Sequence, residues 1–186
     1  MKKILFLLII VMLSSCARIS LSRNIRKFVG SEIQYPSELM LFKGRNPYYE
    51  IYDEPYGSLV IWYDSNECSP CRLSSISDLK KLFNLCRDSL PGIDVRVVFT
   101  PSFEKKDLFM EFVQDSEREF PVFVDENNVF GKTNKTIPQE PKYHTFLIDK
   151  NNKVLLTGNP LLGPAIWNLY RSTMFSLSDN KGVLDL

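Results

Sequence analysis

A pair of cysteines directly after a buried strand limits the folds open to this chain of 186 residues more than any other feature. Residues 58–63 (SLVIWY) form a compact apolar run between a glycine and a polar turn, which is typical of a strand buried on both faces. Cys68 and Cys71 follow with C-x-x-C spacing, and apolar residues then recur at helical spacing as far as Cys86. The sequence therefore predicts a strand, a cysteine pair and an amphipathic helix in immediate succession.

The rest of the chain predicts further strands and helices in alternation. The predicted strands are 93–100, 121–124, 145–148 and 154–157, and the predicted helices are 103–112 and 164–174. The last two strands flank a polar turn and predict a hairpin. Strands that alternate with helices imply parallel pairing, and the hairpin adds antiparallel strands. The expected class is α/β, with a central mixed sheet flanked by helices.

The position of the two cysteines favours a reactive thiol. Unpaired N–H groups and the helix dipole at a helix N-terminus stabilise a thiolate, so Cys68 is expected to be nucleophilic near neutral pH. Cys71 lies about one turn further on, close enough to form a disulfide with Cys68. Pro70 between them is tolerated in a first helical turn and stiffens it, so it is a candidate modulator of the pair. Cys86, in contrast, falls on the apolar stripe and is expected in the core.

The first sixteen residues resemble a bacterial lipoprotein signal. Lys2 and Lys3 precede the apolar run 4–13, which is too short to span a bilayer but has the length of a signal-peptide core. Small residues then lead to Cys16, the expected lipidation site. The alternatives are a secretory signal and a buried N-terminal helix that contains a cysteine. By resemblance to enterobacterial sorting rules, Ala17 favours a lipid anchor in the outer membrane, facing the periplasm.

Composition excludes several classes of function. The chain has 23 Lys+Arg against 22 Asp+Glu, and loss of Lys2 and Lys3 with the signal would leave 21 basic residues. A nucleic-acid partner is therefore not expected, because such proteins need a basic surplus. The single histidine, His144, excludes His-rich metal sites, so neither a metal nor a cofactor is expected. The chain also has no phosphate-binding loop and no G-x-S-x-G motif.

These observations divide the chain into five parts, all of which are expectations. They are a signal peptide (1–15), a lipidated tether (16–23), an N-terminal extension of short strands and loops (24–57), the main domain (58–178) and a C-terminal tail (179–186).

Two segments resemble the thioredoxin superfamily. SLVIWYDSNECSPCRLSSISDLKKLF (58–83) is similar to its strand, active site and helix, and HTFLIDKNNKVLLTGNP (144–160) is similar to its later hairpin. The hairpin is closest to the membrane-tethered, extracytoplasmic branch of thiol-disulfide oxidoreductases and peroxiredoxin-like proteins. The resemblance implies a thioredoxin-like fold in which Cys68 is the attacking thiol and Cys71 the resolving thiol.

The chain departs from the family pattern at two places that are candidate modulators of the thiol. Glu67 stands where the family commonly has tryptophan, and its carboxylate would oppose formation of the Cys68 thiolate. Tyr143, followed by His144, stands where the family has a cis-proline facing the cysteines. A protonated His144 would favour the thiolate, and the alternative is a histidine at a strand start that is hydrogen-bonded to the backbone.

Three functions are consistent with these residues. The first is a lipid-anchored thiol-disulfide oxidoreductase of the bacterial envelope, acting on protein or small-molecule disulfides and thiols together with a redox partner protein. The second is a non-catalytic binding or scaffold lipoprotein on the same fold, with Cys68–Cys71 as a structural disulfide. The third is a peroxide reductase in which Cys68 becomes a sulfenic acid.

Overall fold

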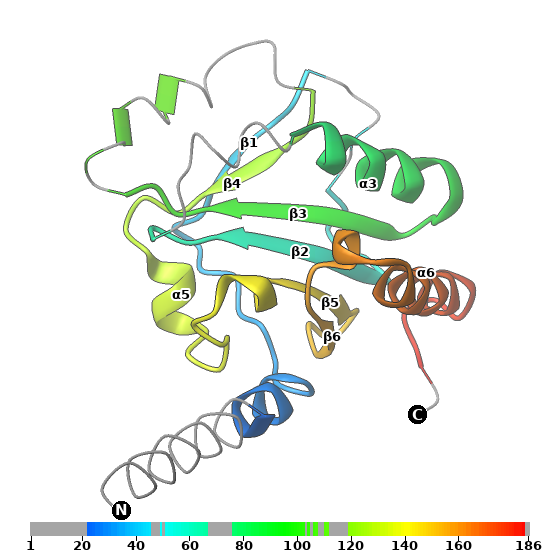
Figure 1. The fold of residues 1–186 in the computed structure, drawn as a ribbon. Helices are drawn as coiled ribbons and strands as arrows, with labels where there is room; N and C mark the ends of the chain where they lie inside the picture. The colour runs from blue at the N-terminus through cyan, green and yellow to red at the C-terminus, as the bar shows by residue number, and fades with distance from the viewer. Residues whose placement is uncertain are drawn as a thin grey trace, which may run out of the picture.

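A six-stranded mixed sheet forms the centre of the described part of the molecule, with strand order β1-β4-β3-β2-β5-β6 (Figure 1). The structure is a computed structural model that describes residues 22–45, 49, 51–66, 76–102, 104, 106–107, 110–111 and 119–184. Its strands are β1 (Met40–Phe42), β2 (Gly57–Tyr63), β3 (Ile93–Phe99), β4 (Val122–Val124), β5 (Thr145–Asp149) and β6 (Val154–Thr157). Its labelled α-helices are α3 (Ile76–Ser89), α5 (Val129–Thr133) and α6 (Pro164–Asp179), and residues 22–28 are also helical. Its labelled 3-10 turns are η2 (Pro141–Tyr143) and η3 (Pro160–Leu162).

The pairing of β2 defines the sheet. β2 runs parallel to β3, with Gly57 opposite Ile93 and Tyr63 opposite Phe99, and it runs antiparallel to β5 on its other side. β3 pairs in parallel with β4, whereas β1 and β6 are antiparallel to their neighbours at the two edges. The expected α/β class, with a central mixed sheet, a C-terminal antiparallel hairpin and flanking helices, is confirmed.

Alternate residues of β2 enter two separate cores because successive side chains in a strand point to opposite faces. Leu59 and Ile61 belong to the core that also contains apolar residues of α3 and α6. Val60 and Trp62 belong to the opposite core, which contains Phe130 of α5. Since both faces of the strand are covered, its sequence is apolar throughout, as predicted for 58–63.

The N-terminal segment packs on the second core and on the edge of β6. The ring of Phe28 meets that of Phe146 edge to face, with centroids 5.1 Å apart. Gly30 N donates to the carbonyl oxygen of Val154 at 2.7 Å, and Val154 N donates to the carbonyl oxygen of Ser31 at 2.8 Å. Residues 30–31 therefore occupy part of the outer edge of the sheet.

Two predictions, one helix boundary and one loop, differ from the structure. α6 continues to Asp179 rather than ending at residue 174, because Leu177 extends the buried stripe of Tyr170 and Met174. α5 lies in a segment that its polar composition predicts to be a loop. Most of the predicted helix 103–112 lies outside the described residues.

Cys86 lies on the buried face of α3, as predicted.

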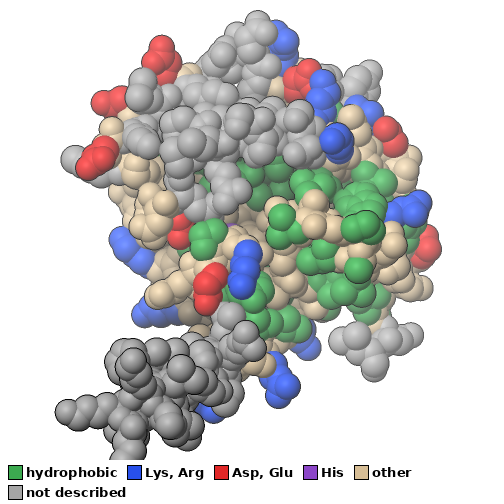
Figure 2. Space-filling view, in the orientation of Figure 1, with side chains coloured by type: hydrophobic (Ala, Val, Ile, Leu, Met, Phe, Trp, Pro, Cys, Tyr) green, Lys and Arg blue, Asp and Glu red, His purple; other side chains and the backbone are tan. Residues whose placement is uncertain are grey.

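Large hydrophobic side chains are exposed on η3 and α6, namely Leu161, Leu162 and Leu169. Figure 2 shows hydrophobic side chains gathered on the face that carries α6. Within the described ranges, no helix has the length and apolar character needed to cross a membrane.

Candidate functional site

The candidate site lies at the carboxyl end of β2, where the chain leads into the cysteine pair. Glu67, Cys68, Pro70 and Cys71 lie outside the described residues, and so does Cys16. The description stops at Asn66 and resumes at Ile76 in α3. The described part of the site consists of the residues near Asn66, the last described residue before the C-x-x-C segment.

A tight turn follows the strand. The backbone N–H of Asn66 donates to Oδ1 of Asp64 at 2.9 Å, so the buried carboxylate stabilises a turn within its own segment. Directly after the neighbouring strand β3, Thr100 N donates to the carbonyl oxygen of Tyr63 at 2.8 Å. The backbone is thus fixed as far as the second residue before Cys68.

His144 lies beside β2 on the side of β5, opposite to β3. Its backbone carbonyl oxygen accepts a 2.9 Å hydrogen bond from Trp62 N, which extends the β2–β5 pairing by one residue. The imidazole is buried against the indole of Trp62, with ring centroids 4.5 Å apart. Nε2 of His144 lies 2.9 Å from the carbonyl oxygen of Pro138. Because a carbonyl oxygen only accepts, Nε2 carries the hydrogen and donates it.

Tyr143 is the last residue of η2. Its carbonyl oxygen accepts a 3.0 Å hydrogen bond from Oγ1 of Thr157, which connects η2 to the end of β6. No cis peptide bond occurs among the described residues. Of the four predicted modulators, Tyr143 and His144 lie among the described residues. The side chain of His144 lines the cavity beside β2, and its ring is hydrogen-bonded to the backbone.

A buried polar chain connects Trp62 to α5. Nε1 of Trp62 donates to Oγ1 of Thr100 at 3.0 Å, and Oγ1 of Thr100 donates to Oδ2 of Asp125 at 3.3 Å. The carboxylate of Asp125 also accepts from the backbone N–H groups of Val129 (2.8 Å) and Phe130 (2.9 Å). Asp125 thereby satisfies the free N–H groups at the start of a five-residue helix. Sequence reasoning did not identify Thr100 or Asp125, because their partners are set by tertiary contacts.

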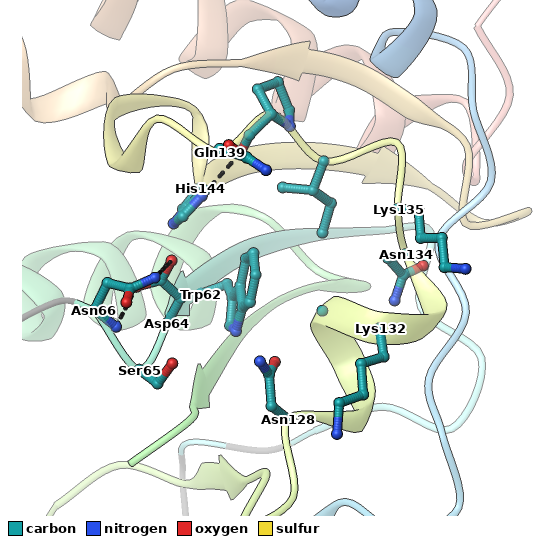
Figure 3. Close-up of a pocket in the computed structure, with 13 residues that line it drawn as sticks. Trp62, Asp64, Ser65, Asn66, Asn128, Lys132, Asn134, Lys135, Gln139 and His144 are labelled. Carbon is teal, nitrogen blue, oxygen red and sulfur yellow. Dashed lines mark hydrogen bonds between the residues drawn. The ribbon is translucent and has the colours of Figure 1, made fainter. Parts of the chain in front are cut away.

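A cavity of about 560 Å³ opens between β2 and α5 (Figure 3). Trp62 and His144 line it on the side of the sheet, and the turn after β2, α5 and residues 134–139 complete its walls. Four amide side chains contribute to the lining: Asn66, Asn128, Asn134 and Gln139. We call this feature the amide-lined cavity. Among the described residues, no group of three or more His, Cys, Asp or Glu side chains could hold a metal ion.

A second buried polar group lies on β3. Burial raises the pKa of Asp94, and the guanidinium of Arg96, 3.2 Å away, opposes that effect. Asp94 also accepts from Tyr52 N at 3.3 Å, which fastens the segment before β2 to the side of β3. Its partners connect backbone segments, so we assign Asp94 a structural role.

No known family model matches the chain, and no curated protein matches it. Solved structures of low similarity include an uncharacterized thioredoxin-like protein from Porphyromonas gingivalis (16% identity, 69% of this chain and 78% of that chain, TM-score 0.46). A putative thiol:disulfide interchange protein DsbE from Chlorobium tepidum shares 18% identity over 80% of this chain and 99% of its own, with a TM-score of 0.45. An exposed lipoprotein thioredoxin from Streptococcus pneumoniae shares 19% over 74% and 98%, with a TM-score of 0.43. Since these TM-scores lie below 0.5, the proposals below rest on the residues of this chain.

Proposed function

We propose that the chain is a thioredoxin-like thiol-disulfide oxidoreductase that is anchored to the bacterial cell envelope through Cys16. The observation that carries this proposal is the position of the C-x-x-C sequence directly beyond the carboxyl end of β2, the strand in the middle of a sheet covered on both faces. Ligand and catalytic sites of α/β sheets lie at the carboxyl ends of such strands. The buried strand gives the cysteine segment a rigid base.

Chain connectivity limits how far the Cα of Cys68 can lie from the amide-lined cavity. Asn66 lines the cavity, and Cys68 is two residues further along. Because successive Cα atoms are about 3.8 Å apart, the Cα of Cys68 lies within roughly 8 Å of that of Asn66.

The reaction is a thiol-disulfide exchange in two steps. The Cys68 thiolate attacks one sulfur of a substrate disulfide, which forms a mixed disulfide and releases the other substrate sulfur as a thiolate. The Cys71 thiolate then attacks Sγ of Cys68 and releases the second substrate thiol. Two electrons pass to the substrate, and the Cys68–Cys71 disulfide is formed. The reverse sequence oxidises a dithiol, and the reduction potential decides the direction.

The proposed substrates are protein or small-molecule disulfides in the envelope, and a redox partner protein would regenerate the cysteine pair. A lipid on Cys16 would hold the domain at the outer membrane, facing the periplasm, where disulfides form and persist.

The test is the reduction potential of Cys68–Cys71 in a soluble fragment that begins after Cys16. A reversible couple between about −120 and −270 mV is expected, which is the range of working oxidoreductases. A couple below about −300 mV is that of a structural disulfide and would favour the scaffold function instead. The Cys71→Ser variant, trapped as a mixed disulfide with substrate at Cys68, would identify the attacking thiol directly.

A further inference from the structure

We propose that a basic surface around the turn between β5 and β6 lies against an anionic phospholipid bilayer and holds the carboxyl end of β2 away from the membrane. The inference rests on the proposed function and deepens it, because a lipid on Cys16 would bring the domain to a bilayer without deciding which side of the domain faces it. Its support comes from six cations, two exposed valines and the point at which the chain leads toward Cys16.

Three segments that are far apart in the sequence meet at this turn. Gly30 follows the helical residues 22–28, and a Cβ at Gly30 would lie 3.8 Å from Cε of Lys153. After α6, a Cβ at Gly182 would lie 2.9 Å from the Cβ of Lys150. We call the solvent-facing side of segments 22–33, 149–153 and 179–183 the basic surface, and its cations are Arg23, Arg26, Lys27, Lys150, Lys153 and Lys181.

The six cations of the basic surface are exposed, and ion pairs do not neutralise them. None of the six forms an ion pair in the described part of the chain, whereas Lys80, Arg96 and Lys106 are each paired with a carboxylate. Figure 2 shows Lys and Arg side chains at the lower end of the molecule. The same segments carry three carboxylates, those of Glu32, Asp149 and Asp179. Because the whole chain has 23 basic and 22 acidic residues, this twofold excess of cations is local.

The basic surface is limited to the β6 side of the sheet. Tyr56 N donates to the carbonyl oxygen of Gly92 at 2.7 Å, which places the segment before β2 beside the start of β3. Two exposed carboxylates of that segment, Asp53 and Glu54, therefore lie on the far side of β2 from β6. The charge thus differs between the two sides of the same end of the sheet, and the β6 side is the one that suits an anionic partner.

Two valines and the position of the tether favour a bilayer over an acidic protein as that partner. Val29 is 39% exposed and Val183 is 46% exposed, and both lie in the same segments as the cations. Apolar side chains beside cations fit the boundary between lipid headgroups and acyl chains. Ser22 is six residues after Cys16, so their Cα atoms lie within roughly 22 Å of each other.

This orientation keeps the proposed redox site clear of the bilayer. Gly57, at the start of β2, pairs with Asp149, which begins the turn of the basic surface. β2 runs for seven residues from that point, which corresponds to about 20 Å at about 3.3 Å per residue. The C-x-x-C sequence follows the opposite end of the strand, so soluble proteins can reach that end while the basic surface contacts headgroups.

Binding can be measured with the chain from residue 17 onward, which keeps every described residue and carries no lipid. The vesicles consist of phosphatidylcholine alone or of phosphatidylcholine with about 30% phosphatidylglycerol, and sedimentation measures the bound fraction. We expect binding to the mixed vesicles to be at least about fivefold stronger than binding to phosphatidylcholine alone. High salt should weaken it, because exposed charges are screened.

Two matched pairs of variants provide the decisive comparison. Lys150→Gln with Lys153→Gln removes two charges from the basic surface and should weaken binding to the mixed vesicles at least about fivefold. Lys132→Gln with Lys142→Gln removes the same charge from exposed positions near the carboxyl end of β2, and should change binding less than about twofold.

The valines separate a bilayer from an acidic protein. Val29→Ser with Val183→Ser keeps all six cations and should weaken vesicle binding at least about twofold, because apolar side chains contribute at a bilayer interface. If immobilised polyglutamate retains the chain and the vesicles do not, the partner is an acidic protein and the inference fails. Equal binding to the two kinds of vesicle, or equal loss in the two lysine pairs, overturns it as well.

Lipidation is measured separately, so that failure of the anchor can be distinguished from failure of the basic surface. Mass spectrometry of the full chain, expressed with its signal in a bacterial host, reports acyl groups on Cys16. If Cys16 is lipidated but the chain from residue 17 does not bind the mixed vesicles, the basic surface alone is overturned. Vesicle binding by a chain that is never lipidated supports the basic surface and overturns the anchor.

Discussion

The imidazole of His144 lies against the indole of Trp62, with ring centroids 4.5 Å apart and an angle of 37° between the ring planes. Nε2 of the same imidazole donates to the carbonyl oxygen of Pro138, and the carbonyl oxygen of His144 accepts from Trp62 N. One residue thus joins the central strand to the loop that forms the far wall of the amide-lined cavity.

Replacement of His144 should therefore lower the free energy of unfolding, independently of any redox reaction. His144→Phe keeps a ring against Trp62 but leaves the buried carbonyl oxygen of Pro138 without its donor, which costs about 1–3 kcal/mol. Urea unfolding monitored by tryptophan fluorescence measures the change. A variant as stable as the parent chain would show that the hydrogen bond to Pro138 contributes nothing net.

Asp125 is expected to control the formation of α5. Asp125→Ala removes the acceptor of two backbone N–H groups and of the Thr100 hydroxyl, and should lower the free energy of unfolding by about 1–2 kcal/mol. Asp53→Ala, at an exposed position, is the matched control and should be nearly neutral. Equal stability of the two variants would contradict the capping role.

Cys86 should be unreactive in the folded protein. Burial raises the pKa of its thiol to about 12, and the negative charge of Asp94 contributes in the same direction. Because the thiolate is the nucleophile, iodoacetamide at pH 8 should leave Cys86 unmodified until urea unfolds the chain. Peptide mass spectrometry distinguishes it from the other cysteines. Rapid alkylation under native conditions would mean that α3 opens readily.

Asp94 should give stability a measurable dependence on pH. Burial raises its pKa above the ordinary 3.8, so the folded state binds the proton more tightly than the unfolded chain does. The contribution of this group to stability is therefore greatest below pH 3.8 and falls as the pH rises through the raised pKa. Asp94→Asn removes that fall, so its stability relative to the parent chain should increase between pH 4 and pH 7. A constant difference across this interval would refute the assignment.

Glu67 offers a test of the thiol at the proposed active site. Since a carboxylate beside Cys68 disfavours the thiolate, Glu67→Trp should lower the pKa of Cys68 and increase its alkylation rate below pH 7. Glu67→Gln separates the loss of charge from the gain of a ring. If the cysteine pair is a static disulfide of a scaffold protein, Cys68 will resist alkylation in the parent chain and in both variants.

The central strands could be predicted from the sequence because burial on both faces gives an unbroken apolar run. Residues 58–63 and 93–100 correspond to β2 and β3 almost residue for residue. The hairpin 145–157 is equally recognisable, since two apolar runs flank a polar turn. In the structure Asn152 of this turn has a φ of 59°. In these segments the local pattern and the tertiary environment require the same residues.

The cavity could not be predicted because its lining residues come from segments that are far apart in the sequence and meet only in the folded chain. Asn128 and Lys132 lie in a polar segment that has no helical periodicity, and α5 forms there because Asp125 accepts its first N–H groups. His144 was identified as a candidate, but its bond to Pro138 and its position against Trp62 follow from the pairing of β5 with β2.

Residues 30–33 lie along the outer strand of the sheet, where an open row of N–H and C=O groups would otherwise face solvent. Ile33 N donates to the carbonyl oxygen of Asn152, Glu32 forms a bridge with Lys153, and Gly30 bonds to Val154. An uncovered edge strand is a template for pairing with other chains. Under the proposed lipid anchor, molecules would be crowded at a membrane surface, and this cover would limit aggregation there. Soluble fragments that begin before residue 24 should stay monodisperse, whereas fragments that begin after residue 33 should self-associate.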